Sequence, residues 1–179
     1  MGGRYPNLHS TPPYGGIMVL YTPGRTSSYP DEPVGSGIRI HFLGGGDEVG
    51  NVGVILEDET STRLLIDYGL APTSPPRYPS EAPPVTDAIF THTDIDHIGM
   101  APWLVGNHQT RLHATSLTAS LSRVMWKDTY KVSSIEGYPL PWDRRDEDEA
   151  NEAWETHNYN EWVEPVSYTH LTLPTILLV

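Results

Sequence analysis

The chain has 179 residues, of which 37% are hydrophobic, and a formal net charge of -12; this suits one globular domain or part of one. No apolar run approaches the roughly 20 residues of a membrane-spanning helix, and the acidity argues against broad, nonspecific binding of nucleic acids. Cysteine is absent, which excludes disulfides, thiolate zinc sites and cysteine nucleophiles, so any bound metal must be held by His, Asp or Glu.

Residues 1–37 contain six prolines among many Gly and Ser residues. Such a composition blocks regular structure, and we predict a disordered leader over this range. The only apolar run in it, residues 17–21, fits either a short strand or a merely adhesive segment. No apolar core of a secretory signal follows the first residues, so we expect a cytoplasmic location.

Four short segments that precede the first chemical motif are predicted to be strands, because they alternate or are rich in β-branched residues. They cover residues 38–43, 52–57, 63–66 and 86–90. The polar residues 58–62 have the length of a hairpin connection. Residues 71–84 contain six prolines and are predicted to form an irregular surface loop.

The segments that follow the motif are predicted to be helix, strand, helix and helix. They cover residues 100–105, 111–114, 116–132 and 146–155. Thr115 or Ser116 is the expected cap of the long helix, and Asp143 that of the last one. This order of strands and helices predicts an α/β fold.

The long helix is expected to bury the apolar residues that recur near the helical period. These are Leu117, Leu121, Val124 or Met125, and Val132. The tryptophans are interpreted as packing residues rather than platforms for nucleobases. We expect His41 and His113 to pack or to form hydrogen bonds within strands, and His108 and His157 to be solvated.

The strongest chemical motif places four candidate metal ligands within six residues, directly after an apolar strand: His92, Asp94, Asp96 and His97. A loop that leaves a strand can direct alternate side chains to one point and the adjacent pair to a second point about 4 Å away, the spacing of two-metal hydrolytic sites. The alternative is that these are polar loop residues that cap the next helix. Four ligand types in one loop favour the metal site.

The motif His-x-Asp-x-Asp-His resembles the His-x-His-x-Asp-His signature of the metallo-β-lactamase superfamily. The resemblance implies an αββα sandwich that binds two divalent metal ions. It assigns His92 and Asp94 to the first metal, and Asp96 and His97 to the second. Asp94 departs from the signature. Because a carboxylate is a harder ligand than imidazole, we expect the metal preference to move from zinc toward iron or manganese.

Further segments resemble the β-CASP branch of this superfamily, which comprises RNA-processing nucleases related to cleavage and polyadenylation specificity factor. These segments are residues 42–50 and 64–69; residues 70–79 and the region from Leu112 to Lys131 are similar to archaeal members. The resemblance covers residues 38–164. It implies that Asp67 supports the metal loop and that Asp96 combines a catalytic role with metal binding.

Residues 165–175 resemble the translation of a sequencing-library adapter, so we expect the natural sequence to end near Glu164. Residues 165–179 are then an artefact, His170 is no ligand, and residues 38–164 form a partial metallo-β-lactamase domain. In the family the remaining metal ligands come later in the chain. The fragment by itself is therefore expected to bind metal weakly and to be inactive.

The parent protein is predicted to be a metal-dependent phosphodiesterase, a ribonuclease acting through metal-bound hydroxide. We expect the parent protein to bind RNA and not to bind a membrane. The sequence leaves open whether it forms a homodimer. One alternative is a hydrolase of a small ester, thioester or lactam. The other is a noncatalytic partner subunit, in which Asp94 marks the decay of the site.

Overall fold

The computed structural model describes residues 17–20 and 38–159. Within these residues, seven strands form one mixed sheet in which neighbours in sequence are neighbours in space. The strands are β1 Ile17–Leu20, β2 Ile38–Gly44, β3 Gly53–Glu57, β4 Arg63–Tyr68, β5 Asp87–Ile89, β6 Arg111–Thr115 and β7 Trp154–His157. The pairs from β1 to β4 are antiparallel, and those from β4 to β7 are parallel.

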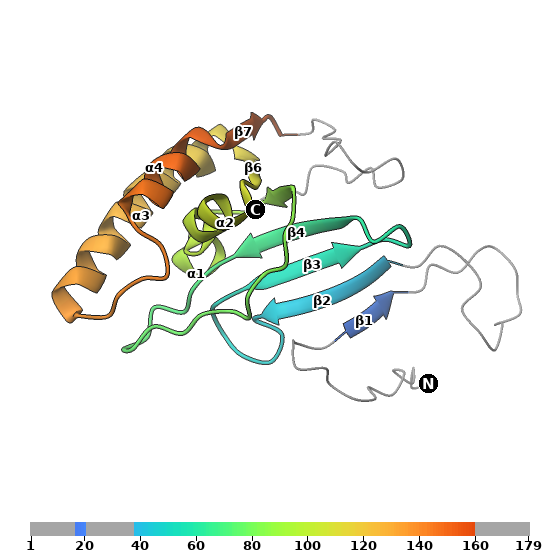
Figure 1. Cartoon of the computed structure of the whole chain (residues 1–179), viewed down its shortest axis with the longest axis horizontal. Coiled ribbons are helices and arrows are strands. Elements are labelled where there is room, and N and C mark those ends of the chain that lie inside the picture. Colours follow the sequence, from blue (N-terminus) through green and yellow to red (C-terminus); the bar gives the residue numbers. More distant parts are fainter. Residues whose placement is uncertain (1–16, 21–37, 160–179) are drawn as a thin grey trace, which may run out of the picture.

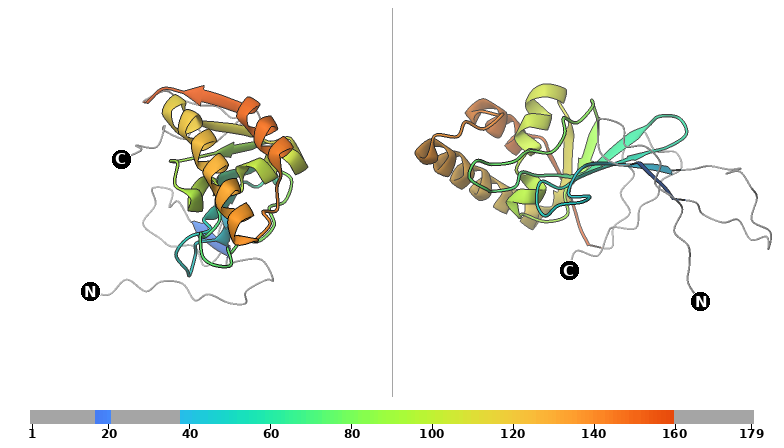
Figure 2. Two further views of the ribbon diagram at one scale, coloured as in Figure 1. Left: turned by 90° about the vertical axis from the view of Figure 1, so that its left-hand side faces the viewer. Right: turned by 90° about the horizontal axis from the view of Figure 1, so that it is seen from below.

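In the described part of the chain four helices accompany the sheet, namely α1 Ile95–Ile98, α2 Ala101–His108, α3 Ser116–Glu136 and α4 Arg144–Glu152. They gather around the parallel half of the sheet, while the hairpins of β2, β3 and β4 extend away from them (Figures 1 and 2). The α/β fold class predicted from the sequence is confirmed. Among the described residues, no helix is long and apolar enough to cross a membrane.

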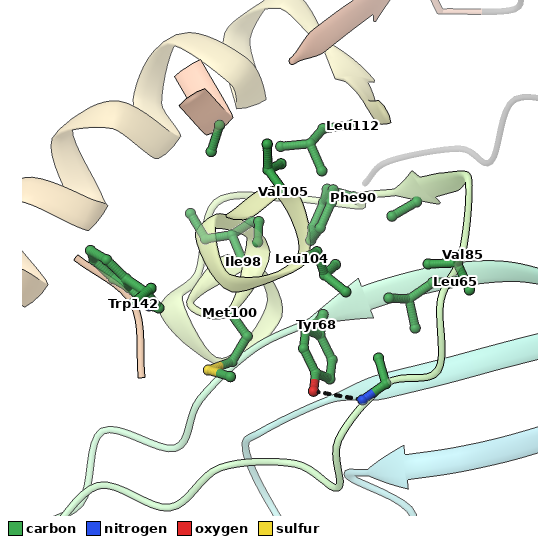
Figure 3. Packing of buried hydrophobic residues seen from close by; sticks show 14 of the residues in the cluster. Leu65, Tyr68, Val85, Phe90, Ile98, Met100, Leu104, Val105, Leu112 and Trp142 are labelled. Atoms are coloured by element: carbon green, nitrogen blue, oxygen red, sulfur yellow. Dashed lines mark hydrogen bonds between the residues drawn. The ribbon is translucent and has the colours of Figure 1, made fainter. Parts of the chain in front are cut away.

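The core lies between the parallel strands and the helices, where side chains from β4, β5, α1, α2 and β6 meet (Figure 3). Tyr68 is 1% exposed, and its hydroxyl both donates to the carbonyl of Ser80 and accepts from the amide of Ala82, each at 3.0 Å. Burial raises the pKa of Tyr68 to about 12. These hydrogen bonds attach the proline-rich loop to the end of β4, directly beside the motif.

The long helix α3 buries a different face from the one that the apolar pattern predicts. Its buried residues are Thr118, Ser122 and Trp126. The predicted face is exposed: Leu117 by 63%, Leu121 by 43%, Val124 by 61% and Val132 by 44%, and Met125 alone is partly buried against the core.

The hydroxyl groups on the buried face of α3 are satisfied within the helix, because Ser122 donates to the carbonyl of Thr118 at 2.8 Å. Trp126 is the large apolar side chain among the buried residues of α3, and the partly buried Met125 and Tyr130 also pack against the core.

The last predicted helix is also corrected at its end. Helix α4 begins after Asp143, which forms a capping box with Asp146, as predicted for the cap. It stops at Glu152, and residues 154–157 form strand β7, paired with β6. Trp154 stacks on Trp126 with ring centroids 5.9 Å apart, and this packing outweighs the local preference for helix.

Within the predicted leader, residues 17–20 form strand β1, antiparallel to β2. The rest of the leader lies outside the described residues, as do Trp162, His170 and the predicted adapter segment 165–179. The expectations for those segments stay predictions.

Glu57 at the end of β3 is 5% exposed and lies between Arg39 and Arg63, each with a nitrogen 2.6 Å from a carboxylate oxygen. The hydrogen bond from Arg63 lowers the pKa of Glu57 below 4.5; burial opposes this, and the nearby positive charges add to it. A carboxyl with a depressed folded-state pKa stabilises the fold above its unfolded-state pKa and loses that contribution as the pH falls through the folded value.

We therefore expect the Glu57→Gln variant to lose stability at neutral pH and to depend less steeply on pH below about 4.5. Urea denaturation at several pH values between 7 and 3 measures both effects. If the free energies of unfolding of the wild type and the variant fell equally with pH, Glu57 would not be the cause of the loss of stability in acid.

Candidate metal centre

The predicted ligand motif lies where strand β5 leaves the core. Phe90 is 1% exposed, and the chain then turns through residues 91–94 into the single turn of α1. Asp94 occupies the N-cap position, but its side chain makes no capping hydrogen bond and is 73% exposed. Its carboxylate is thus available to a metal ion. The alternative, that Asp94 only caps helix α1, lacks the hydrogen bond that a capping side chain makes.

The loop arranges the four predicted ligands as two pairs of donor atoms. His92 Nε2 lies 3.5 Å from a carboxylate oxygen of Asp94, and His97 Nε2 lies 3.9 Å from one of Asp96. The two imidazole rings are 4.0 Å apart between centroids. The pairs coincide with the division into two metals that the resemblance implies. The ligand roles themselves stay a prediction.

Asp67 supports this loop from the end of β4. The residue is 3% exposed and has a φ of 54°, a conformation that non-glycine residues rarely adopt. Its carboxylate accepts hydrogen bonds from the amide and the hydroxyl of Thr91, at 2.8 and 2.7 Å, and lies 2.8 Å from His97 Nδ1. A single buried carboxylate thus joins both ends of the motif.

The contact between Asp67 and His97 determines which ring nitrogen faces the loop. An ionised carboxylate accepts only, so in the neutral imidazole of His97 Nδ1 carries the hydrogen and Nε2 keeps its lone pair. Burial opposes protonation of His97, but the hydrogen bond to Asp67 and the negative charges of Asp67, Asp96 and Asp94 raise its pKa. The same charges favour a bound cation near Nε2.

Replacing Asp67 by asparagine is expected to weaken metal binding by about 10- to 100-fold, the usual effect of losing a carboxylate that orients a histidine ligand. The side-chain oxygen of the new asparagine could still accept from Thr91, so the fold should change little. Competition with a chromophoric chelator measures the affinity, and circular dichroism checks the fold. Unchanged affinity in a folded variant would exclude this role.

Gly69 allows the motif to approach β4, a role that the sequence-based interpretation missed. A Cβ at this position would lie 1.8 Å from the backbone carbonyl of Asp96 and 2.4 Å from the amide of His97. The amide of Val52 donates to the same Asp96 carbonyl at 2.9 Å, and the amide of Gly69 to the carbonyl of Val52 at 2.9 Å. In the sequence, the only indication of this role is that a glycine directly follows Asp67-Tyr68.

The donor atoms of the motif suit divalent metals in kind, since imidazole and carboxylate bind zinc, iron and manganese. Their number is smaller than a complete site needs. Among residues 17–20 and 38–159, neither pair is joined by a third His, Asp or Glu to make a group within 4.8 Å. Catalytic zinc sites generally use three protein ligands, so the described residues would supply only part of each predicted site.

A sequence profile of the family described as the metallo-beta-lactamase superfamily matches residues 45–165, well over half of the chain. The chain belongs to the metallo-beta-lactamase superfamily. The matched range contains Asp67 and the complete motif, so the resemblance from which the superfamily was predicted is confirmed.

Two similar proteins are called transcription termination factor FttA. The one from Lokiarchaeum sp. (strain GC14_75) is 30% identical over 117 residues, which are 61% of this chain and 18% of that protein. The one from Methanocaldococcus jannaschii is 29% identical over 117 residues, again 61% and 18%. A third relative is cleavage and polyadenylation specificity factor 73 of Drosophila melanogaster, 28% identical over 132 residues, 69% of this chain and 19% of that protein.

This superfamily member therefore spans about a fifth of the length of the curated relatives that it matches. The predicted resemblance to cleavage and polyadenylation specificity factor is confirmed. Among solved structures, an archaeal metallo-beta-lactamase superfamily protein from Sulfolobus tokodaii matches with a TM-score of 0.40 and 13% identity, over 70% of this chain and 50% of that one.

Two expectations for the remaining histidines have different outcomes. His113 is buried and forms hydrogen bonds within the sheet, as expected. His157 was expected to be solvated, but it is half-buried and lies 3.0 Å from His113 Nδ1. The strand that carries His157 was not predicted, because residues 154 and 155 were assigned to the helix of residues 146–155 and residues 156 and 157 to no element, so the sequence offered no signal for this contact.

Proposed function

We propose that the protein to which this chain belongs is a metal-dependent hydrolase of the β-CASP branch, and that it cleaves phosphodiester bonds in RNA. The observation that carries the proposal is the contact of buried Asp67 with His97 Nδ1 at 2.8 Å. In the neutral imidazole this contact leaves Nε2 of His97 free of a hydrogen beside the carboxylate of Asp96. A histidine that needed only to be solvated would not require a buried carboxylate behind it.

In this proposal His92 and Asp94 hold one divalent ion, and Asp96 and His97 hold the second. When bound, such a pair lowers the pKa of water and stabilises negative charge on a phosphoryl oxygen. Asp67 fixes the ring of His97 and, through Thr91, the start of the loop. The exposed side chain of Asp94 places its carboxylate on the solvent side of the site, where substrate enters.

The RNA substrate is supported by the names of the relatives, which describe a transcription termination factor and a cleavage and polyadenylation specificity factor. RNA binding requires positive charge, and this chain has a net charge of -12. We therefore place the basic surface for RNA in parts of the parent protein beyond the described residues.

The decisive experiment uses the protein from the complete reading frame, purified without chelator and assayed on end-labelled RNA. Metal analysis should find two divalent ions per protein, and Asp96→Asn should reduce the rate of cleavage by about 100-fold or more, a loss comparable to that of other single catalytic groups. Asp148→Asn, which removes an exposed carboxylate on α4, is the matched control and should retain full activity.

Each other outcome favours a different conclusion. Purified protein without metal would exclude the hydrolase. Bound metal with cleavage of thioesters or lactams, but not of RNA, would contradict the nuclease and indicate a small-molecule enzyme. Bound metal without any hydrolysis would indicate a noncatalytic subunit. Recovery of iron or manganese rather than zinc would support the effect expected of Asp94.

A further inference from the structure

A second group of metal-binding side chains lies on the parallel strands β6 and β7. His113 pairs with Glu155 across the two strands, and Thr115 pairs with His157. Since side chains alternate along a strand, residues 155 and 157 share one face, and the pairing puts His113 on that face too. Their donor atoms all lie within 4.8 Å of one another. None of them belongs to the motif of residues 92–97.

A buried carboxylate orients this group from the neighbouring strand β5. Asp87 is fully buried, and its Oδ1 lies 2.8 Å from His113 Nε2 and 2.7 Å from a guanidinium nitrogen of Arg111. Because the carboxylate accepts only, the hydrogen of His113 is on Nε2 and the lone pair is on Nδ1. The lone pair faces His157 Nε2 at 3.0 Å and a Glu155 oxygen at 3.7 Å.

We propose that His113 Nδ1, His157 Nε2 and the Glu155 carboxylate bind one divalent transition-metal ion of the zinc class. Two imidazoles and one carboxylate are a ligand set that zinc accepts, with water as the fourth ligand. Asp87 is the positioning residue, as carboxylates behind histidine ligands generally are. The bound ion joins β7, the strand at the end of the sheet, to β6.

The metal-free geometry indicates what must move. The two imidazole rings are nearly parallel, at 21°, with centroids 5.2 Å apart, so the facing nitrogens point almost directly at each other. This is the arrangement of a hydrogen bond from His157 to His113. In a tetrahedral zinc site two nitrogens lie about 3.3 Å apart with their lone pairs converging on the metal. A rotation of the half-buried His157 side chain at the end of β7, with the ring hydrogen moved from Nε2 to Nδ1, achieves this.

The test is a titration with Co²⁺ of untagged protein in which the motif is disabled by His92→Ala and Asp96→Ala. We expect one equivalent of Co²⁺ to bind, with the visible absorption of a low-coordinate site. Adding His157→Ala should weaken the binding by tenfold or more, and Glu155→Gln, at a half-exposed carboxylate, should also weaken it. Asp87→Asn should weaken it by about 10- to 100-fold.

His108→Ala is the matched control, because it removes another partly buried imidazole, from the end of α2. It should leave the Co²⁺ titration unchanged, and circular dichroism confirms that each variant folds. If Asp87→Asn fails to fold, His157→Ala and Glu155→Gln carry the test. No binding in the motif-disabled protein, or equal binding with and without His157, would overturn the proposal and leave a hydrogen bond between two histidines. Failure here does not bear on the motif, which is tested separately by RNA cleavage.

Discussion

Trp126→Ala is expected to lower the free energy of unfolding by about 3–5 kcal/mol, the usual cost of truncating a fully buried tryptophan. Trp126 has no exposed surface, its ring stacks on Trp154, and its indole nitrogen donates to the carbonyl of Ile98 at 2.9 Å. The variant loses this packing and leaves a buried carbonyl without its donor. Urea denaturation, followed by far-UV circular dichroism, measures the change.

The control for Trp126 is Leu121→Ala on the same helix. Leu121 is 43% exposed, so its truncation should cost less than about 1 kcal/mol, as for most surface positions. The apolar pattern of the sequence predicts the reverse order, with Leu121 in the core. A large loss for Leu121→Ala together with a small loss for Trp126→Ala would therefore contradict the structure and restore the face predicted from the sequence.

Strand β3 was predictable because one of its faces is buried and the period of two is plain. In β3 the burial alternates from Gly53 to Glu57, and the predicted strand differs from the observed one by a single residue. The start of helix α3 was predictable because Thr115 can cap it and apolar residues recur near the helical period. The helix continues to Glu136, beyond the predicted end at residue 132. Its orientation was not predictable, because Thr118 and Ser122 look polar in sequence, but the hydroxyl of Thr118 bonds to that of the cap residue Thr115 and the hydroxyl of Ser122 to the Thr118 carbonyl.

The candidate site was predictable only where its residues are adjacent in sequence. Asp94, Asp96 and the two histidines of the motif are found in one loop by inspection. The contact of Asp67 with His97 spans 30 residues, and the resemblance to a family, not spacing, suggested it. The group around His113 spans 44 residues to His157 and depends on the pairing of two parallel strands, the second of which was not predicted.

The position of the motif also depends on the close approach of its backbone to β4, which is tightest at Gly69. Gly69→Ala is expected to lower the free energy of unfolding by about 3 kcal/mol, at the upper end of the usual cost of overpacking. The new Cβ would lie 1.8 Å from the Asp96 carbonyl, and both partners are held by hydrogen bonds to Val52. Neither can move without breaking the bonds that join the loop to β4 and β3. Chemical denaturation measures the loss.

Gly137→Ala separates this close approach from the general cost of replacing a glycine. Gly137 has a φ of 77° at the end of α3 and nothing within 4 Å of the added Cβ, so only backbone strain of about 1 kcal/mol is expected. If Gly69→Ala cost no more than this control, the loop would have room to shift. The metal affinity of Gly69→Ala then shows whether the loop has shifted. A loop that moves away from β4 separates His97 from Asp67, so metal binding should weaken even where the fold is retained.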